Sequence, residues 1–290
     1  MTRFALALLT LALQAQTPVS VPFTCTPEDM DFAGMACPEA EPCPVYVEIS
    51  QVYGRANKVM VSGDLHSSAA TLYSILLFSD DGGLTWAEPF QRLRGVTFDH
   101  AQFVDDKTGW IAGQNMVPVP RDPFLLFTTD GGKSWRQHAV LEEDSPGQIL
   151  QFAFQDARHG LIVLDRHTAG NRYELHETQG GGESWSLRSK TTQPPVIPDW
   201  NPPSETWRAR ADQATKTFRI ERRSEAGQWA AVAAVPVRAG SCKVAPAAEP
   251  AAPPVSGTEA APQPEKDYVE ELHLGGTPPK HTGKKKKPKS

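Results

Sequence analysis

Short apolar runs separated by turn residues recur through the middle of the chain. In the clearest stretch they cover residues 97–104, 109–113, 124–128 and 134–141. Val, Ile, Phe, Trp and Thr are enriched in these runs, and none of the runs shows the 3.6-residue spacing of an amphipathic helix. Gly, Asp and Ser between the runs favour tight turns. The pattern therefore predicts an all-β protein built from short antiparallel strands.

One eight-residue turn sequence repeats at intervals of about 50 residues. S-D-D-G-G-L-T-W at 79–86 matches T-T-D-G-G-K-S-W at 128–135. A third copy, T-Q-G-G-G-E-S-W at 178–185, has Gly180 in place of the aspartate. A degenerate fourth copy, S-E-A-G-Q-W, lies at 224–229. These segments are called octets below.

A second repeated segment precedes the octets. F-V-D-D-K-T-G-W at 103–110 aligns with F-Q-D-A-R-H-G-L at 154–161. Together the two segments predict four strands in each unit of about 50 residues, which is typical of the blades of a β-propeller. We expect a propeller of about four blades over residues 45–240, with units at 45–95, 96–145, 146–193 and 194–240.

The fourth unit is the weakest, because the Pro-rich segment 192–204 stands where its first strand should start. We expect residues from 18–44 to supply the missing strand. A closed ring of four blades, an open partial propeller, and two chains that join their blades are all compatible with these repeats.

The residue types of the octets fit a structural role. An Asp carboxylate can accept backbone N–H bonds across a hairpin turn, Gly allows positive φ, a hydroxyl adds a turn bond, and Trp packs between sheets. Calcium binding by Asp80, Asp81 and Asp130 is disfavoured, because too few oxygen ligands are present. We assign this structural role to Ser79, Asp81, Gly83, Thr85, Trp86, Thr128, Asp130, Gly132, Ser134, Trp135, Thr178, Gly182, Ser184 and Trp185.

The pattern S/T-x-D-x-G-x-S/T-W matches the Asp-box, or BNR, repeat. With F-x-D-x-x-x-G-W-I-A-G ahead of it, the repeat resembles that of the photosystem II assembly/stability-factor type of propeller over roughly residues 45–235. That resemblance implies an exported β-propeller that acts as an assembly scaffold. The octets are also similar to those of sialidases, sortilin-type receptors and some glycoside hydrolases.

The two ends of the chain differ from its middle. Residues 1–15, with Arg3 before an apolar run, are typical of a signal peptide. Residues 16–44 form a Cys-containing segment, and the Pro/Ala-rich residues 241–290 are predicted to be disordered. Residues 280–289 are rich in Lys, which is typical of a solvated, solubilising tail; the alternative is that its tip contacts an anionic envelope surface.

The net charge and the cysteine content add two expectations about partners and disulfides. The net charge of -5 gives no reason to expect a specific nucleic-acid partner. Export would favour two disulfides among the four cysteines Cys25, Cys37, Cys43 and Cys242. We expect Cys242 to pair with one of the other three, which would tie the end of the domain to its beginning.

The sequence contains no recognisable combination of catalytic residues. The motifs H-E-x-x-H, G-x-S-x-G and the Walker loop are missing from it. The acids at 142–144 are adjacent, which does not give the opposed carboxylates of a glycosidase. The His residues are scattered, so we expect no catalytic residue, no cofactor and no metal.

A binding face is expected on the loops opposite the octet turns, because propeller ligands generally lie there. Its candidate residues are His66, Asn115, Arg121, Arg166, His167, Arg172 and Trp200. We expect an exported, periplasmic or extracellular, non-catalytic scaffold that binds a protein partner, such as an envelope-complex assembly factor. The alternative is a glycan-binding or glycan-hydrolysing protein of the sialidase or glycosidase type.

Overall fold

The computed structural model describes residues 17–116, 119–198 and 206–243. The chain divides into two compact units, Met1–Pro246 and Ala247–Ser290, and all described residues belong to the first unit. The signal peptide, Trp200 and the tail beyond residue 243 lie outside the described residues. No helix among those described is long and apolar enough to cross a membrane.

Four sheets of four strands make up the fold, which is an all-β propeller-type architecture as predicted. Blade 1 has the order β16-β2-β3-β4, with β2 (Cys43–Arg55), β3 (Lys58–His66), β4 (Thr71–Ser79) and β16 (Arg238–Cys242). Blade 2 contains β5 (Val96–Phe103), β6 (Gly109–Asn115), β7 (Arg121–Thr128) and β8 (Arg136–Ala139). Blade 3 contains β9 (Gln148–Phe154), β10 (Gly160–Asp165), β11 (Tyr173–Thr178) and β12 (Ser186–Thr191). Blade 4 has the order β1-β15-β14-β13, with β1 (Thr17–Pro18), β13 (Trp207–Asp212), β14 (Thr217–Arg223) and β15 (Trp229–Pro236).

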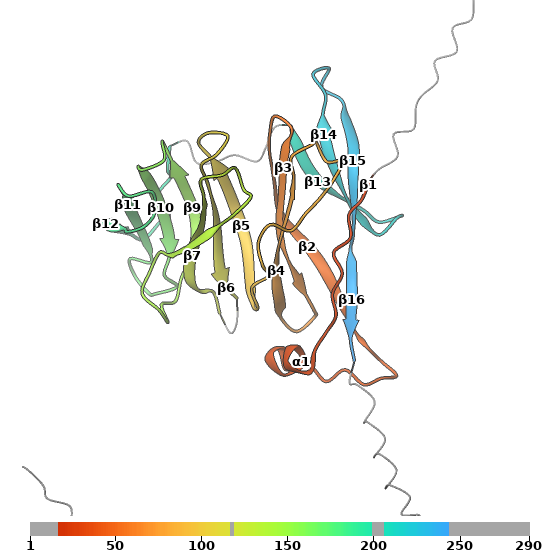
Figure 1. The fold of residues 1–290 in the computed structure, drawn as a ribbon. Coiled ribbons are helices and arrows are strands. Elements are labelled where there is room, and N and C mark those ends of the chain that lie inside the picture. The colour runs from red at the N-terminus through yellow and green to blue at the C-terminus, as the bar shows by residue number, and fades with distance from the viewer. Residues whose placement is uncertain (1–16, 117–118, 199–205, 244–290) are drawn as a thin grey trace, which may run out of the picture. The chain divides into compact units, whose positions relative to one another are not determined.

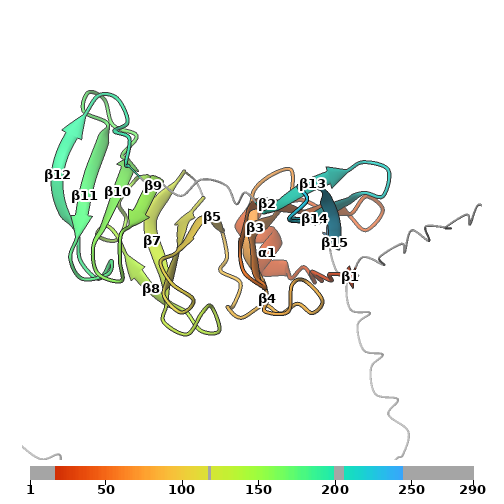
Figure 2. The ribbon, with the colours of Figure 1, turned by 90° about the horizontal axis from the view of Figure 1, so that it is seen from above.

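The blades pack face to face in the order 4-1-2-3, as Figures 1 and 2 show. Trp207 and Ile220 of blade 4 share a hydrophobic cluster with blade 1. Met60 joins blade 1 to a second cluster with blade 2, and Trp110 joins blade 2 to a third cluster with blade 3. Among the described residues no cluster joins blades 3 and 4. These residues therefore form an open array of four blades.

The N-terminal segment supplies the fourth strand of blade 4, as expected, but not at the position of the missing first strand. β1 pairs in parallel with β15, at the opposite edge of the sheet from β13. The two-residue β1 continues with a bond from the Val19 N–H to the Ala234 carbonyl. The N-terminal segment therefore pairs with β15 at one edge of the sheet. At the other edge lies β13, which contacts β2 of blade 1.

Two disulfides hold the N-terminal segment to blade 1. Cys25 bonds Cys242 at the end of β16, which confirms the expected pairing of Cys242, and Cys37 bonds Cys43. Two such bonds are typical of an oxidising environment. Between them lies α1 (Pro27–Ala33), which begins with a capping box in which Thr26 and Asp29 exchange hydrogen bonds of 2.9 and 3.3 Å.

Candidate functional site

The octets form the hairpin turns of the blades through a fixed set of hydrogen bonds. In blade 2, Asp130 Oδ1 accepts the N–H groups of Lys133 and Ser134 at 2.9 and 3.0 Å, and the Ser134 hydroxyl donates to Oδ2. Thr128 Oγ1 donates to Asp130 and accepts the Gly132 N–H, while Trp135 Nε1 donates to the Gly132 carbonyl at 3.1 Å. The bond from the Ser134 hydroxyl, with the other donors, lowers the pKa of Asp130 to about 2. The Asp130 carboxylate therefore stabilises the hairpin turn.

Blade 1 repeats this arrangement, and blade 3 shows what happens without the aspartate. Asp81 accepts bonds from Leu84 N and from both the N–H and the hydroxyl of Thr85, and the hydroxyl bond lowers its pKa to about 2. In blade 3, Gly180 stands at that position and Trp185 Nε1 is buried without a hydrogen-bond partner. The octet of blade 3, which lacks the carboxylate, therefore makes fewer hydrogen bonds than those of blades 1 and 2.

The octet turns also contact the neighbouring turn of their own blade. The N–H groups of Gly82, Gly131 and Gly181 donate to the carbonyls of Asn57, Lys107 and Arg158 at 2.7–2.8 Å. Both turns of a blade therefore lie at the same end of its sheet, and the loops that carry the candidate binding residues lie at the other end.

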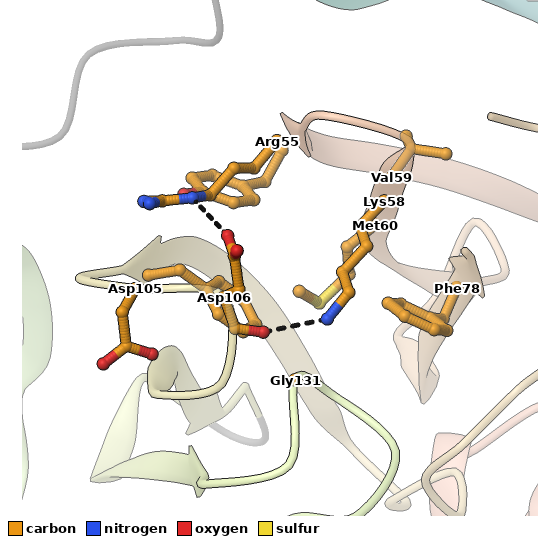
Figure 3. Close-up of a pocket in the computed structure, with 10 residues that line it drawn as sticks. Arg55, Lys58, Val59, Met60, Phe78, Asp105, Asp106 and Gly131 are labelled. Carbon is orange, nitrogen blue, oxygen red and sulfur yellow. Dashed lines mark hydrogen bonds and ion pairs between the residues drawn. The ribbon is translucent and has the colours of Figure 1, made fainter. Parts of the chain in front are cut away.

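Figure 3 shows how blades 1 and 2 meet on the octet side. Arg55 Nε bonds Asp106 Oδ1 at 2.9 Å, and Lys58 Nζ donates to the Asp106 carbonyl at 2.8 Å. The cavity beneath them has a volume of about 20 Å³ and is lined by Met60 and Phe78 among others. This volume holds about one water molecule, so the place is a packed contact between blades rather than a ligand site.

The candidate binding residues at the opposite end already have acidic partners. Arg121 pairs with Asp122 at 3.1 Å and also with Asp144, and Arg166 pairs with Glu174 at 3.1 Å. Arg172 pairs with Asp165. The other described candidates follow the same rule: Asn115 Nδ2 donates to Asp122 at 3.2 Å, His167 lies 3.6 Å from Asp165, and His66 lies 3.4 Å from Asp64. The arginines therefore do not converge on a shared anion site.

A surface that no sequence motif indicated lies on the outer face of blade 3. Val163 and Ala153 on this face are buried beneath Ile197, which follows the last strand of the blade. Beside Ile197 a groove of about 510 Å³ is lined by residues that include Leu161 and Arg188. No other blade covers this face in the described part of the chain. Its signal in the sequence is the unbroken apolar run L-I-V-L at 161–164, which is typical of a strand buried on both faces.

Comparison with known proteins found a few solved structures. No family model and no curated protein match the chain. YCF48 bound to a D1 peptide is 18% identical, with a TM-score of 0.34 over 67% of this chain and 57% of that one. YCF48 from Cyanidioschyzon merolae is 18% identical, with a TM-score of 0.33 over 63% and 65%. A GH74 xyloglucanase from Xanthomonas campestris is 17% identical, with a TM-score of 0.35 over 46% and 19%. The chain spans less than two thirds of each of these structures, and no residue role transfers from them.

Proposed function

We propose that this protein is an exported, non-catalytic propeller scaffold that binds an extended segment of a partner protein at the outer face of blade 3. The observation that carries the proposal is an apolar sheet face without a covering blade. Blades 4, 1 and 2 each bury one face against the next blade in the array. On blade 3 the corresponding face is covered, among the described residues, by Ile197 and not by a blade. The groove beside Ile197 at this end of the array is therefore the candidate interaction site.

The groove has the chemistry of a peptide site. Its lining includes Leu161 and Ile197 together with the ion pair between Arg188 and Glu177 at 3.2 Å. Val196 beside it is 83% exposed. The adjacent strand β12 is an edge strand with no further strand paired to it among the described residues, so an added strand could pair with its backbone groups. An extended peptide could place apolar side chains against this lining and pair with that edge.

Other features support the same class of function. The repeat resemblance implies assembly scaffolds, and an envelope complex is the kind of partner we propose. The two disulfides support an oxidising, exported location, periplasmic or extracellular. The loop arginines Arg121 and Arg166 contribute less to the proposal, because each is neutralised by an acid of this chain.

Site-specific photo-crosslinking tests the proposal. A photoreactive amino acid is placed at Val196 in the full-length protein, expressed in cells that export it. The matched control places it at Leu84, which is 69% exposed on the octet turn of blade 1. We expect one protein adduct from position 196 that is lost on adding Leu161→Glu, and no such adduct from position 84.

Equal adducts from positions 84 and 196, or none from 196, would overturn the binding surface. The non-catalytic part of the proposal has its own measurement. Purified protein is incubated with β-glucans and sialosides, and we expect no hydrolysis. Measurable turnover by the purified protein would show that the chain is an enzyme.

A further inference from the structure

Three ligand-type side chains meet at the contact between blades 1 and 2. Asp64 and His66 are two residues apart on β3 and therefore point to the same face of the sheet. Glu48 lies directly opposite Asp64 on β2. One carboxylate oxygen from each acid and one ring nitrogen of His66 all lie within 4.8 Å of one another.

The distances suit a shared ion better than direct hydrogen bonds. His66 Nδ1 is 3.4 Å from Asp64 Oδ1 and 3.7 Å from Glu48 Oε2. This nitrogen is buried and makes no hydrogen bond. Ligand atoms about 2.1 Å from a tetrahedral metal ion lie about 3.4 Å from one another, which is close to the separations found here.

The two carboxylates of the cluster face His66 and have no Lys or Arg partner among the described residues. The Asp64 side chain is only 10% exposed; Thr97 Oγ1 donates to its Oδ2 at 3.1 Å, and its Oδ1 faces His66. In the described part of the chain no Lys or Arg forms an ion pair with Glu48 or Asp64. Buried carboxylates without a counter-charge are costly, and a bound cation would supply one.

We propose that Glu48, Asp64 and His66 form a binding site for one divalent transition-metal ion, with Zn²⁺ as the best-fitting member. The imidazole ligand favours Zn²⁺ over Ca²⁺ or Mg²⁺, which prefer oxygen ligands. The Glu48 side chain is 65% exposed, so the ion can enter from solvent and keep one position for water. The site is independent of the peptide groove. No metal was expected from the sequence, in which Glu48 is far from the D-x-H pair; the pairing of β2 with β3 brings them together.

Isothermal titration of the purified full chain with Zn²⁺, after dialysis against a chelator, tests this site. We expect one tight equivalent that raises the melting temperature and is not displaced by equimolar Ca²⁺. Glu48→Gln, Asp64→Asn and His66→Gln should each weaken binding by roughly a hundredfold or more, because even partners outside the ligand set are worth about 10–100-fold.

The matched control is His167→Gln. His167 has the same 31% side-chain exposure as His66 and lies 3.6 Å from buried Asp165, but Arg172 already neutralises that acid. The control should bind Zn²⁺ as the parent does. Glu48→Gln alters an exposed side chain and keeps the test valid if a buried substitution unfolds the protein, as checked by circular dichroism. Failure of the parent to bind Zn²⁺, or parental affinity in Glu48→Gln and His66→Gln, would overturn the proposal.

Discussion

Removal of the long-range disulfide offers a quantitative test of how the chain is held together. The bond between Cys25 and Cys242 joins residues separated by 217 positions, whereas Cys37 and Cys43 are separated by 6. The perturbation replaces both cysteines of one pair with alanine. Each pair contains one cysteine that is completely buried, Cys242 or Cys37, so the loss of packing is similar in the two variants.

The expected difference follows from loop closure in the unfolded chain. A crosslink removes more entropy from the unfolded state when it closes a longer loop, which gives about 5 kcal/mol for the Cys25–Cys242 bond and about 2 kcal/mol for Cys37–Cys43. The Cys25/Cys242 variant should therefore lose about 3 kcal/mol more in its free energy of unfolding than the Cys37/Cys43 variant.

Urea unfolding measures both losses. The transition is followed by tryptophan fluorescence and by circular dichroism, and coincident curves establish a two-state transition. Equal losses in the two variants, or a larger loss from the short loop, would refute the assignment of the long-range bond as the main covalent constraint.

Three further substitutions test separate parts of the structure, with urea midpoints as the measurement. Gly180→Asp should stabilise by about 1 kcal/mol, because the new carboxylate can accept the Ser184 N–H and hydroxyl in open space; destabilisation would contradict the role given to the octet acid. Gln102→Ala should cost about 2 kcal/mol, because the Gln102 amide bonds both the N–H and the carbonyl of Phe154; no loss would contradict it. Burial raises the pKa of Asp99 to about 6. The stability that this shift contributes is therefore fully present below about pH 4 and is lost as the pH rises through about 6. Between pH 4.5 and 7.5, in the presence of a chelator, the free energy of unfolding should fall by roughly 2 kcal/mol more in the parent than in Asp99→Asn. The same dependence of stability on pH in both proteins would exclude this effect.

The blades were predictable because their turns carry local chemistry. Asp81 and Asp130 each hold a hairpin within four residues of themselves, and the hydroxyl and tryptophan around them complete the same bonds. Such short-range requirements leave a repeated pattern in the sequence. The spacing of the pattern then gives the size of a blade.

The bonds between blades were not predictable, because they join residues about 50 positions apart. Gln51 Oε1 accepts the Ala101 N–H, and Gln102 bonds the Phe154 backbone, so a glutamine on the first strand of one blade holds the first strand of the next. Gln151 in blade 3 makes the corresponding bond to the Ile197 N–H. A glutamine in a strand looks like an ordinary exposed residue until the neighbouring blade is placed. The metal-type cluster was missed for the same reason.

The order of the blades in space differs from their order in the sequence. The glycine at the fifth octet position packs on the preceding blade: Gly83 meets Val232, Gly132 meets Phe78 and Gly182 meets Leu125. Blade 4 therefore precedes blade 1 in space although it follows blade 3 in sequence, and two sheet faces are left at the ends.

The two end faces differ in character. On blade 4 the end face carries Arg208 stacked 4.1 Å from the Trp229 ring centre and paired with Glu221 at 2.7 Å, an arrangement that water can solvate. On blade 3 it carries the apolar residues beneath Ile197. These faces do not complement each other, so closure of the ring through blades 3 and 4 is disfavoured. The groove beside Ile197 is where we propose that the partner binds.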